Sequence, residues 1–271
     1  MFRELGELLV GRDSTALVEL IKNSYDADAT VVTVKGENLA NPLRGRIRIT
    51  DDGVGMNASM FEQGFLRIAS RVKEQGDRRS SLYKRRYTGA KGIGRLAAHK
   101  LAKRMTVVSI PDRNAIRDDL TPISASINWN KIEACETLEQ AGATDAVAVE
   151  AVEADNGVGT DILLTELRRK WTPSERTRVI REINAFQPPQ ILVDVPQDIP
   201  SNKLLFATPR VRDVRGKTRD PGFEVHLLGD FDVGEEYWHV VASAADWILE
   251  IESSPDDAAV RYLITPTRTC T

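Results

Sequence analysis

The first strong hydrophobic pattern in the chain lies at residues 14–27. Apolar side chains recur there at Leu17, Leu20 and Ile21, which is the spacing of one face of an α-helix. Ser14 belongs to the residue class that favours the N-cap, where a side-chain oxygen accepts a hydrogen bond from the first turn. The pattern therefore predicts an amphipathic helix over residues 14–27 with Ser14 as its N-cap.

Short apolar stretches rich in β-branched residues follow this helix and predict the strands of a sheet. We expect strands at residues 30–34, 46–50, 105–110, 123–129, 146–152 and 160–165. Helices are expected at residues 58–69 and 93–103. Because the later strands are separated by too few residues for helical crossovers, the sheet should be mixed and largely antiparallel. The expected fold is an α/β sandwich of the α+β class, with helices covering the sheet.

A further helix is expected to begin at about residues 171–174 and to end at Phe186, because two prolines follow at residues 188–189. This helix marks the exit from a first domain at residues 1–170.

The last third of the chain has a weaker pattern. A stretch rich in proline and charged residues, 194–221, precedes strands expected at residues 223–228, 238–242 and 261–265. A sheet needs further strands and a covering layer to bury its faces. Residues 171–271 are therefore predicted to hold a linker helix and the start of a second α/β domain, which we expect to continue beyond the last residue.

Composition excludes some classes of protein without naming a function. Hydrophobic residues make up 41% of the chain and charged residues 28%, which is ordinary for a globular protein and argues against disorder. No apolar run approaches the ~18 residues that a transmembrane helix needs, and the N-terminus lacks the plan of a secretory signal. Because there are only two cysteines, we expect a cytoplasmic protein without a membrane partner.

The formal net charge of −3 gives no overall basic field that would point to nucleic acid. A local basic cluster nevertheless stands at Arg78, Arg79, Lys84, Arg85 and Arg86. Such a run is ordinarily a solvated loop, and the alternative is a contact for nucleic acid. A nucleic-acid partner is thus open but has no other support in the sequence.

The helix predicted at residues 14–27 also carries a polar triad. Glu19, Asn23 and Asp26 stand at i, i+4 and i+7, so they share a stripe about 60° wide, opposite the apolar face. A carboxylate that can deprotonate water, beside an amide oxygen that can bind Mg²⁺, suits metal-assisted hydrolysis of a phosphoanhydride. By itself, however, a polar helix face is more often simply solvated.

A second group of residues follows the strand at 46–50. Asp51 stands at its end, and Gly53 and Gly55 permit tight backbone with positive φ close to a ligand. The carboxylate can accept a hydrogen bond from an exocyclic amine such as adenine N6. An isolated Asp-Gly pair would instead indicate a hairpin turn.

A glycine-rich sequence, Thr-Gly-Ala-Lys-Gly-Ile-Gly at residues 88–94, leads directly into the helix predicted at 93–103. Backbone N–H groups at a helix N-terminus, left open by glycine, bind phosphate, and Lys91 adds a mobile cation. The spacing matches neither the P-loop nor the Gly-x-Gly-x-x-Gly sequence of dinucleotide-binding folds.

Taken in order, these segments resemble the ATP-binding boxes of the GHKL superfamily, which includes gyrase B, the ninety-kilodalton heat-shock chaperones, sensor histidine kinases and MutL. Residues 17–27 resemble its N box, residues 51–56 the next box and residues 89–94 the phosphate box. Residues 159–164 resemble the last box. The resemblance covers residues 5–167 and implies a Bergerat-type α/β sandwich.

The resemblance also implies roles for individual residues. Glu19 would be the general base for the attacking water and Asn23 the Mg²⁺ ligand, with Asp26 beside them in the cofactor site. Asp51 would anchor adenine, with help from Thr160.

Two further sets of residues complete the implied ATP site. Gly53 and Gly55 would shape the adenine pocket, and Met56 beside them belongs to the cofactor-binding residues. Gly89, Gly92 and Gly94, together with Lys91, would hold the phosphates, and Ile93 is a cofactor-binding residue of the same segment. A lid drawn from residues 63–88 would cover them and should be mobile without nucleotide.

Within the superfamily, a glutamate four residues before Asn23 suits the hydrolytic branches. A histidine kinase would instead need a phosphoacceptor histidine upstream of the first helix. The chain therefore resembles the chaperone-, MutL- and MORC-like bacterial ATP-binding proteins. We expect slow, Mg²⁺-dependent ATP hydrolysis that drives a conformational or dimerisation switch, with a homodimer in the full-length protein. A non-hydrolysing, nucleotide-dependent interaction module, with or without DNA, stays open as the alternative.

Overall fold

The computed structural model describes residues 11–63, 79–88, 94–134, 145–153, 157–184, 220–232, 246–254 and 257–266. Contacts between residues divide the chain into two compact units. The first comprises Met1–Ile183 and Gly216–Asp232, and the second comprises Asn184–Arg215 and Val233–Thr271. In the sequence, residues Gly216–Asp232 of the first unit therefore stand between the two segments that make up the second unit. The domain boundary expected after residue 170 stays a prediction.

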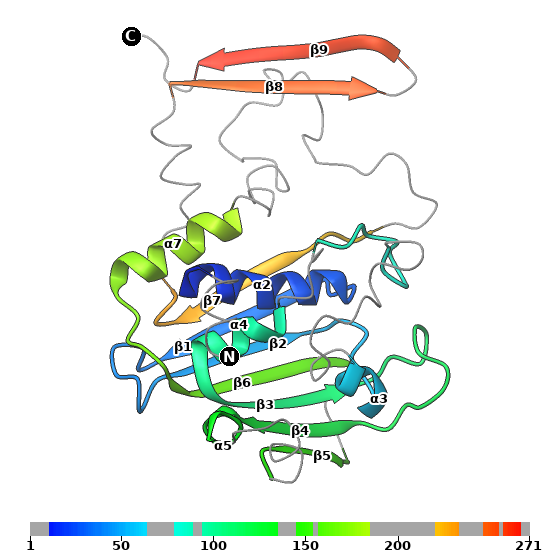
Figure 1. Cartoon of the computed structure of the whole chain (residues 1–271). Coiled ribbons are helices and arrows are strands. Elements are labelled where there is room, and N and C mark those ends of the chain that lie inside the picture. Colours follow the sequence, from blue (N-terminus) through cyan, green and yellow to red (C-terminus); the bar gives the residue numbers. More distant parts are fainter. Residues whose placement is uncertain are drawn as a thin grey trace. The chain divides into compact units, whose positions relative to one another are not determined.

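In the described part of the first unit, one sheet contains β1 (Val31–Glu37), β2 (Arg46–Asp51), β3 (Ala102–Ile110), β4 (Ile123–Asn128), β5 (Val147–Ala151), β6 (Gly159–Leu167) and β7 (Glu224–Gly229). Their spatial order is β5-β4-β3-β6-β2-β1-β7 (Figure 1). Neighbouring strands are antiparallel except β1 and β7, which run parallel. The mixed, largely antiparallel sheet predicted from the sequence is confirmed.

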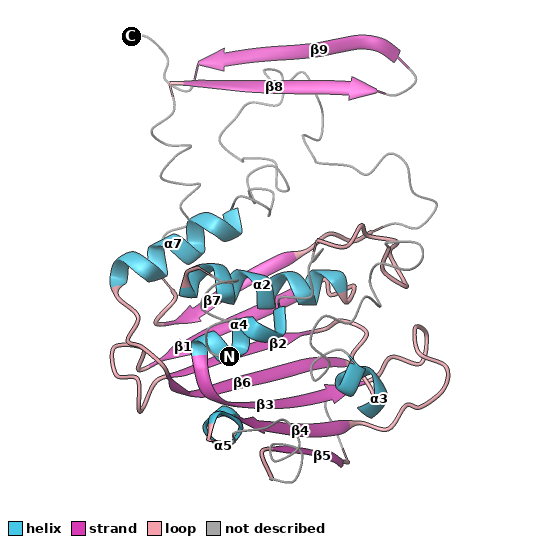
Figure 2. Ribbon diagram, viewed as in Figure 1, coloured by secondary structure: helices cyan, strands magenta, loops and turns pink. Residues whose placement is uncertain are grey.

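The described helices of this unit are α2 (Asp13–Asp26), α3 (Ala58–Phe61), α4 (Gly94–Leu101), α5 (Trp129–Glu133) and α7 (Pro173–Asn184). Figure 2 shows α2 and α4 next to each other across one face of the sheet. Leu17, Leu20 and Ile21 of α2 are fully buried, as expected for its apolar face. The predicted α/β sandwich is therefore present, with α2 covering the sheet.

The alternation of side chains along each strand places one set of apolar residues under these helices. One row of the covered face runs in direct register across five strands through Val34, Ile49, Ile162, Val107 and Ala125. All five side chains are buried. Such a row is the cross-section of the core, because residues directly opposite each other on neighbouring strands share a face.

The start of α2 differs from the prediction. The helix begins at Asp13 with Arg12 as its N-cap, and the Arg12 side chain makes no capping hydrogen bond. Ser14 lies inside the first turn and is buried, and its Oγ donates to Oε1 of Glu182 on α7 at 2.9 Å. The prediction that Ser14 caps the helix was wrong, because its hydroxyl forms a hydrogen bond with Glu182, far along the chain.

Other element boundaries also moved. Of the helix expected at residues 58–69, Ala58–Phe61 is α-helical, and residues 64–69 lie outside the described part of the chain. The helix expected at 93–103 ends at Leu101 because the next residue already pairs in β3. The end predicted for the fourth strand was one residue too long, since Trp129 begins α5.

The strand expected at residues 223–228 is present as β7. It pairs in parallel with β1 and so belongs to the sheet of the first unit. Directly after it, Asp230 accepts a hydrogen bond from the backbone N–H of Leu39 at 2.7 Å. A strand pattern in a sequence does not name the partner strand, so this placement needed the structure.

The described part of the second unit is an antiparallel hairpin of β8 (Trp247–Ser254) and β9 (Asp257–Pro266). β9 contains the strand expected at residues 261–265, while residues 238–242, where another strand is expected, lie outside the described residues. Large apolar side chains are exposed on this hairpin, namely Trp247, Leu249, Ile251, Val260, Tyr262 and Ile264.

Candidate nucleotide site

Three polar residues form the next row of the covered face. Asp51, at the end of β2, stands in register with Thr160 of β6, and Thr160 stands in register with Ser109 of β3. Thr160 and Ser109 are buried. Because Asp51 lies two residues beyond Ile49, the polar row borders the apolar core on the side of the sheet that α2 covers.

The carboxyl group of Asp51 is held by the helix and by its own loop. Its Oδ2 accepts a hydrogen bond from Oγ of Ser24 on α2 at 2.8 Å, and its Oδ1 accepts one from the backbone N–H of Gly53 at 3.0 Å. Burial raises the pKa of Asp51 to about 6, although the hydrogen bonds from Ser24 and Gly53 act to lower it. A further donor from a ligand would stabilise the charged form, because the buried carboxylate has lost most of its water.

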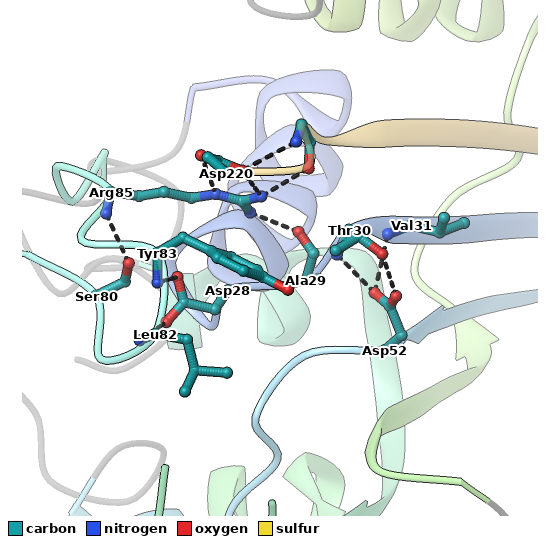
Figure 3. Close-up of polar contacts among 11 residues, drawn as sticks. Asp28, Ala29, Thr30, Val31, Asp52, Ser80, Leu82, Tyr83, Arg85 and Asp220 are labelled. Atoms are coloured by element: carbon teal, nitrogen blue, oxygen red, sulfur yellow. Dashed lines mark hydrogen bonds and ion pairs between the residues drawn. The ribbon is translucent and has the colours of Figure 1, made fainter. Parts of the chain in front are cut away.

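The adjacent Asp52 has a different environment. It is exposed and accepts hydrogen bonds from the backbone N–H groups of Thr30 and Val31, at 2.7 and 2.8 Å, and from the Thr30 hydroxyl (Figure 3). These contacts tie the loop after β2 to the start of β1. Of the two neighbouring carboxylates, Asp51 is therefore the one that lies on the covered face of the sheet.

Gly53 and Gly55 carry the loop after β2 closely past two other segments. At Gly53, a Cβ would lie 2.7 Å from the carbonyl oxygen of Ala27, the same oxygen that accepts a hydrogen bond from the N–H of Val54. Gly55 has a φ of 65°, and a Cβ there would lie 2.1 Å from the carbonyl oxygen of Ile110. The positive φ predicted for both glycines occurs at Gly55 alone, whereas Gly53 permits close packing.

Ser109 connects this loop to β6. Its Oγ accepts a hydrogen bond from the backbone N–H of Met56 at 2.9 Å and lies 2.9 Å from Oγ1 of Thr160. The same Oγ lies 3.3 Å from the carbonyl oxygen of Gly159. The structure thus brings Met56 and Thr160, two residues of the predicted ATP site, to the buried hydroxyl of Ser109, which stands in the same row as Asp51.

Glu19 and Asn23 lie one turn apart on α2, and both are half-buried. Oε1 of Glu19 accepts a hydrogen bond from Nζ of Lys22 at 2.9 Å. The Asn23 side chain makes no hydrogen bond to any described residue. An amide oxygen without a protein partner can coordinate a cation. Ser24, the residue that binds Asp51, directly follows Asn23 on α2, so the same turn of the helix carries the proposed cation ligand and the partner of the proposed base-binding group.

Asp26 contacts the chain just before the glycine-rich sequence. It is buried, and its Oδ1 accepts hydrogen bonds from the backbone N–H and from Oγ1 of Thr88, at 2.8 and 2.9 Å. At the other end of that sequence, Gly94 begins α4. Four residues predicted to bind phosphate lie outside the described residues, namely Gly89, Lys91, Gly92 and Ile93.

The basic cluster of the sequence divides into different environments. Arg79, Lys84 and Arg86 are exposed, and Arg78 lies outside the described residues. The side chain of Arg85, in contrast, is buried and pairs with an aspartate (Figure 3). For Arg85 the expectation of a solvated side chain was wrong. Because its guanidinium is buried, Arg85 cannot contact nucleic acid in this conformation either.

Residues 80–88 are anchored to the turn between α2 and β1. Asp28 is buried in this turn, and its carboxylate accepts hydrogen bonds from the backbone N–H groups of Leu82 and Tyr83, at 2.7 and 3.2 Å. Hydrogen bonds therefore hold the end of the lid expected over residues 63–88 against this turn. The mobility expected of the lid stays a prediction, and its middle lies outside the described residues.

Sequence reasoning missed Ser24, Ser109 and Arg85. Ser24 stands on the buried stripe of α2, and Ser109 stands on the inner face of β3, two residues after Val107. A polar residue at an apolar position indicates a buried hydrogen-bond partner, so both could have been found. Arg85 offers no such indication, because it sits in a run of charges and its partner lies 135 residues later.

Two kinds of feature are absent from the part of the chain that the structure describes. No three side chains of His, Cys, Asp or Glu gather there in a way that would hold a metal ion by themselves. None of its helices combines the length and the apolar character required to cross a membrane.

Comparison with known proteins assigns the family. No curated protein matches the chain. The family model of the histidine kinase-, DNA gyrase B- and HSP90-like ATPases matches residues 12–159, more than half of the sequence. This range contains α2, the loop after β2 and the glycine-rich sequence. The chain, with its helix-covered sheet and its half-buried Asp51, belongs to the histidine kinase-, DNA gyrase B- and HSP90-like ATPase family, whose fold supports nucleotide binding and ATPase-type function.

Proposed function

We propose that the chain binds ATP together with Mg²⁺ and hydrolyses it slowly. One observation carries this proposal: Ser24 of α2 binds the Asp51 carboxyl group, while its neighbour Asn23 leaves a side-chain amide without a partner among the described residues. A group that can hold a purine amine and a group that can hold a cation are thus positioned by one short piece of helix.

The Asp51 carboxylate would accept a hydrogen bond from the exocyclic amine of adenine. Guanine presents a carbonyl oxygen at the same position, and that acceptor would face a carboxylate without a proton between them. Thr160, in register with Asp51, supports it from the next strand. We assign the walls of the same pocket to Gly53, Gly55 and Met56.

Asn23 is the residue proposed to hold Mg²⁺, which would offset phosphate charge and polarise the phosphoanhydride when bound. Glu19 stands one turn earlier and would take the proton of the attacking water as general base. Lys22 engages Oε1 of Glu19 and leaves Oε2 without a hydrogen bond to a described residue, so one carboxylate oxygen is open for that proton.

The phosphates are assigned to the segment between Thr88 and α4. Asp26 holds Thr88 at one end, and Gly94 begins the helix at the other. Backbone N–H groups at the start of a helix favour bound anions, and a lysine adds charge. Five residues are proposed to hold the phosphates, namely Gly89, Lys91, Gly92, Ile93 and Gly94.

Calorimetric titration with ATP and GTP, each with Mg²⁺, tests the adenine assignment. We expect ATP to bind at least about tenfold more tightly than GTP, and Asp51→Asn to abolish most of that preference. Asp52→Asn is the matched control, because Asp52 is the exposed neighbour that binds the start of β1 instead. Equal affinity of the parent chain for ATP and GTP would contradict the assignment.

Hydrolysis is proposed to drive a conformational switch or the formation of a homodimer. The alternative is an interaction module that binds ATP without turning it over, and the engagement of Glu19 by Lys22 is the observation that favours it. Phosphate release measured together with light scattering separates the two. Release that depends on Glu19 supports the ATPase, whereas ATP-dependent association without release supports the module.

A further inference from the structure

The side chain of Arg85 is 1% exposed and packs against two aromatic rings. Its Cζ is 4.8 Å from the ring centroid of Tyr25 and 4.9 Å from that of Tyr83. Cation–π contacts of this kind strengthen when the cation is removed from water. A buried charge nevertheless destabilises a fold unless it is paired, so the hydrogen bonds around Arg85 decide its role.

The guanidinium of Arg85 finds its hydrogen-bond acceptors on two other segments (Figure 3). Its Nε and Nη2 donate to the two carboxylate oxygens of Asp220 at 2.8 and 2.6 Å, and Nη2 also donates to the carbonyl oxygen of Gly222 at 2.6 Å. Its Nη1 donates to the carbonyl oxygen of Ala29. Partial burial acts to raise the pKa of Asp220, but the hydrogen bonds from Arg85 and Gly222 outweigh it and lower that pKa. Arg85 therefore ties its own segment to the turn before β1 and to the chain before β7.

The anchored segment leads into the glycine-rich sequence. Thr88, three residues after Arg85, is bound by Asp26, which lies at the end of the helix that carries Asn23. The contacts of Arg85 do not include Asp51. A change at Arg85 should consequently displace the phosphate end of the candidate site and leave the adenine end in place.

We propose that Arg85 is a positioning residue for phosphate recognition, acting through its ion pair with Asp220. This inference rests on the proposed ATP site. The pair sets the position of residues 80–88 against the chain before β7, so the entry to the phosphate-binding sequence depends on a segment more than a hundred residues away.

Two variants break the pair in different ways. Arg85→Lys keeps a positive charge but cannot bond both oxygens of Asp220 in the planar geometry of a guanidinium, and Asp220→Asn removes the negative charge. Each is titrated with Mg²⁺–ATP by calorimetry and with adenosine by NMR. We expect ATP affinity to fall at least about tenfold and adenosine affinity to stay within about twofold. The double variant should lose little more ATP affinity than either single one, because both act on one contact.

Arg86→Lys is the matched control, since this exposed neighbour should change neither affinity. A general loosening of the fold would weaken adenosine and ATP binding alike, and that result would overturn the proposal. Unchanged ATP affinity in folded Asp220→Asn, with folding checked by its melting temperature, would overturn it as well. If the parent chain binds adenosine and ATP equally, or neither, the proposed ATP site itself is wrong, which distinguishes the two failures.

Discussion

The Ser24 hydroxyl on α2 donates a hydrogen bond to Oδ2 of Asp51, at the end of β2, over 2.8 Å. The bond crosses the interface between the covering helix and the sheet. Ser24 is buried, and burial raises the pKa of its partner to about 6. The orientation of the Asp51 carboxylate and the packing of α2 on the sheet therefore depend on each other.

Replacing Ser24 by alanine should weaken ATP binding by roughly three- to tenfold, because the carboxylate loses the donor that orients it and a typical hydrogen bond contributes about 0.5–1.5 kcal/mol. The same change should raise the pKa of Asp51 further, since the Ser24 bond acts to lower it. Calorimetric titration with ATP at pH 7.5 measures the first effect.

Ser14→Ala is the matched control for that variant. It removes another buried hydroxyl of α2, whose partner Glu182 lies on α7. We expect it to lower the free energy of unfolding by about 1 kcal/mol without changing ATP affinity. Equal ATP affinity in the Ser24→Ala variant and the parent chain would show that Ser24 only packs the helix.

Asp51→Asn should stabilise the nucleotide-free chain at neutral pH. The pKa of Asp51 is raised from an ordinary value of 3.8 to about 6, so its charged form costs stability above that pH. Two units correspond to about 2–3 kcal/mol, of which the neutral amide should recover a part. Thermal unfolding without nucleotide at pH 7.5 should show a higher melting temperature for the variant.

The sign of this effect gives it a distinctive pH dependence. Because the folded-state pKa is raised, the destabilisation is relieved as the pH falls through 6 and is gone near the ordinary value of 3.8. The difference between Asp51→Asn and the parent chain should therefore shrink between pH 7 and pH 4. A difference that is constant over this range would mean that the Asp51 carboxyl group is not destabilised by burial.

ATP binding should also depend on the charge of Asp51. If the carboxylate accepts the adenine amine, affinity should fall by about tenfold between pH 7 and pH 5, with the midpoint near 6. Binding at pH 6 should release protons, which titration in buffers of different ionisation enthalpy detects. The Asp51→Asn variant should show neither effect. If the ATP affinity of the parent chain does not change between pH 7 and pH 5, Asp51 does not bind the adenine base.

The hydrophobic pattern predicted most of the fold because it is a local property. Leu17, Leu20 and Ile21 identified α2 and its buried face, and the strand periodicity located the strands from β1 to β6 within a few residues. The same alternation also places Ser109 on the inner face of β3, and a polar residue at such a position indicates a hydrogen-bond partner in the core.

Long-range partners account for the errors. The sequence indicated Ser14 as a helix cap, but its hydroxyl donates a hydrogen bond to Glu182. Arg85 looked like one charge in a solvated run, but Asp220 and two tyrosine rings bury it. Residue type and spacing do not indicate contacts that form only when distant segments of the chain meet. The roles of Ser14 and Arg85 could therefore be recognised only in the three-dimensional structure.

Asn23→Ala should separate metal binding from base binding. The amide has no partner among the described residues, so its removal should cost little stability. We expect the Mg²⁺-dependent part of ATP affinity to disappear while adenosine affinity stays unchanged, because Asp51 and Ser24 are intact. Titrations of ATP with Mg²⁺ and with EDTA measure this. An undiminished effect of Mg²⁺ in the variant would place the cation ligand elsewhere.

Glu19→Ala should leave ATP affinity within a few-fold of the parent chain but lower the rate of phosphate release by ~10²–10⁴-fold, the usual contribution of a general base. The variant also breaks the ion pair with Lys22 at 2.9 Å. Lys22→Met provides the control, because it breaks the same pair and keeps the carboxylate. If Glu19 is the base, single-turnover release by Lys22→Met should stay within about tenfold of the parent rate, since a half-exposed pair contributes little by itself. Equal losses in the two variants would assign the effect to the ion pair, and parental release by Glu19→Ala would show that another group accepts the proton of the attacking water.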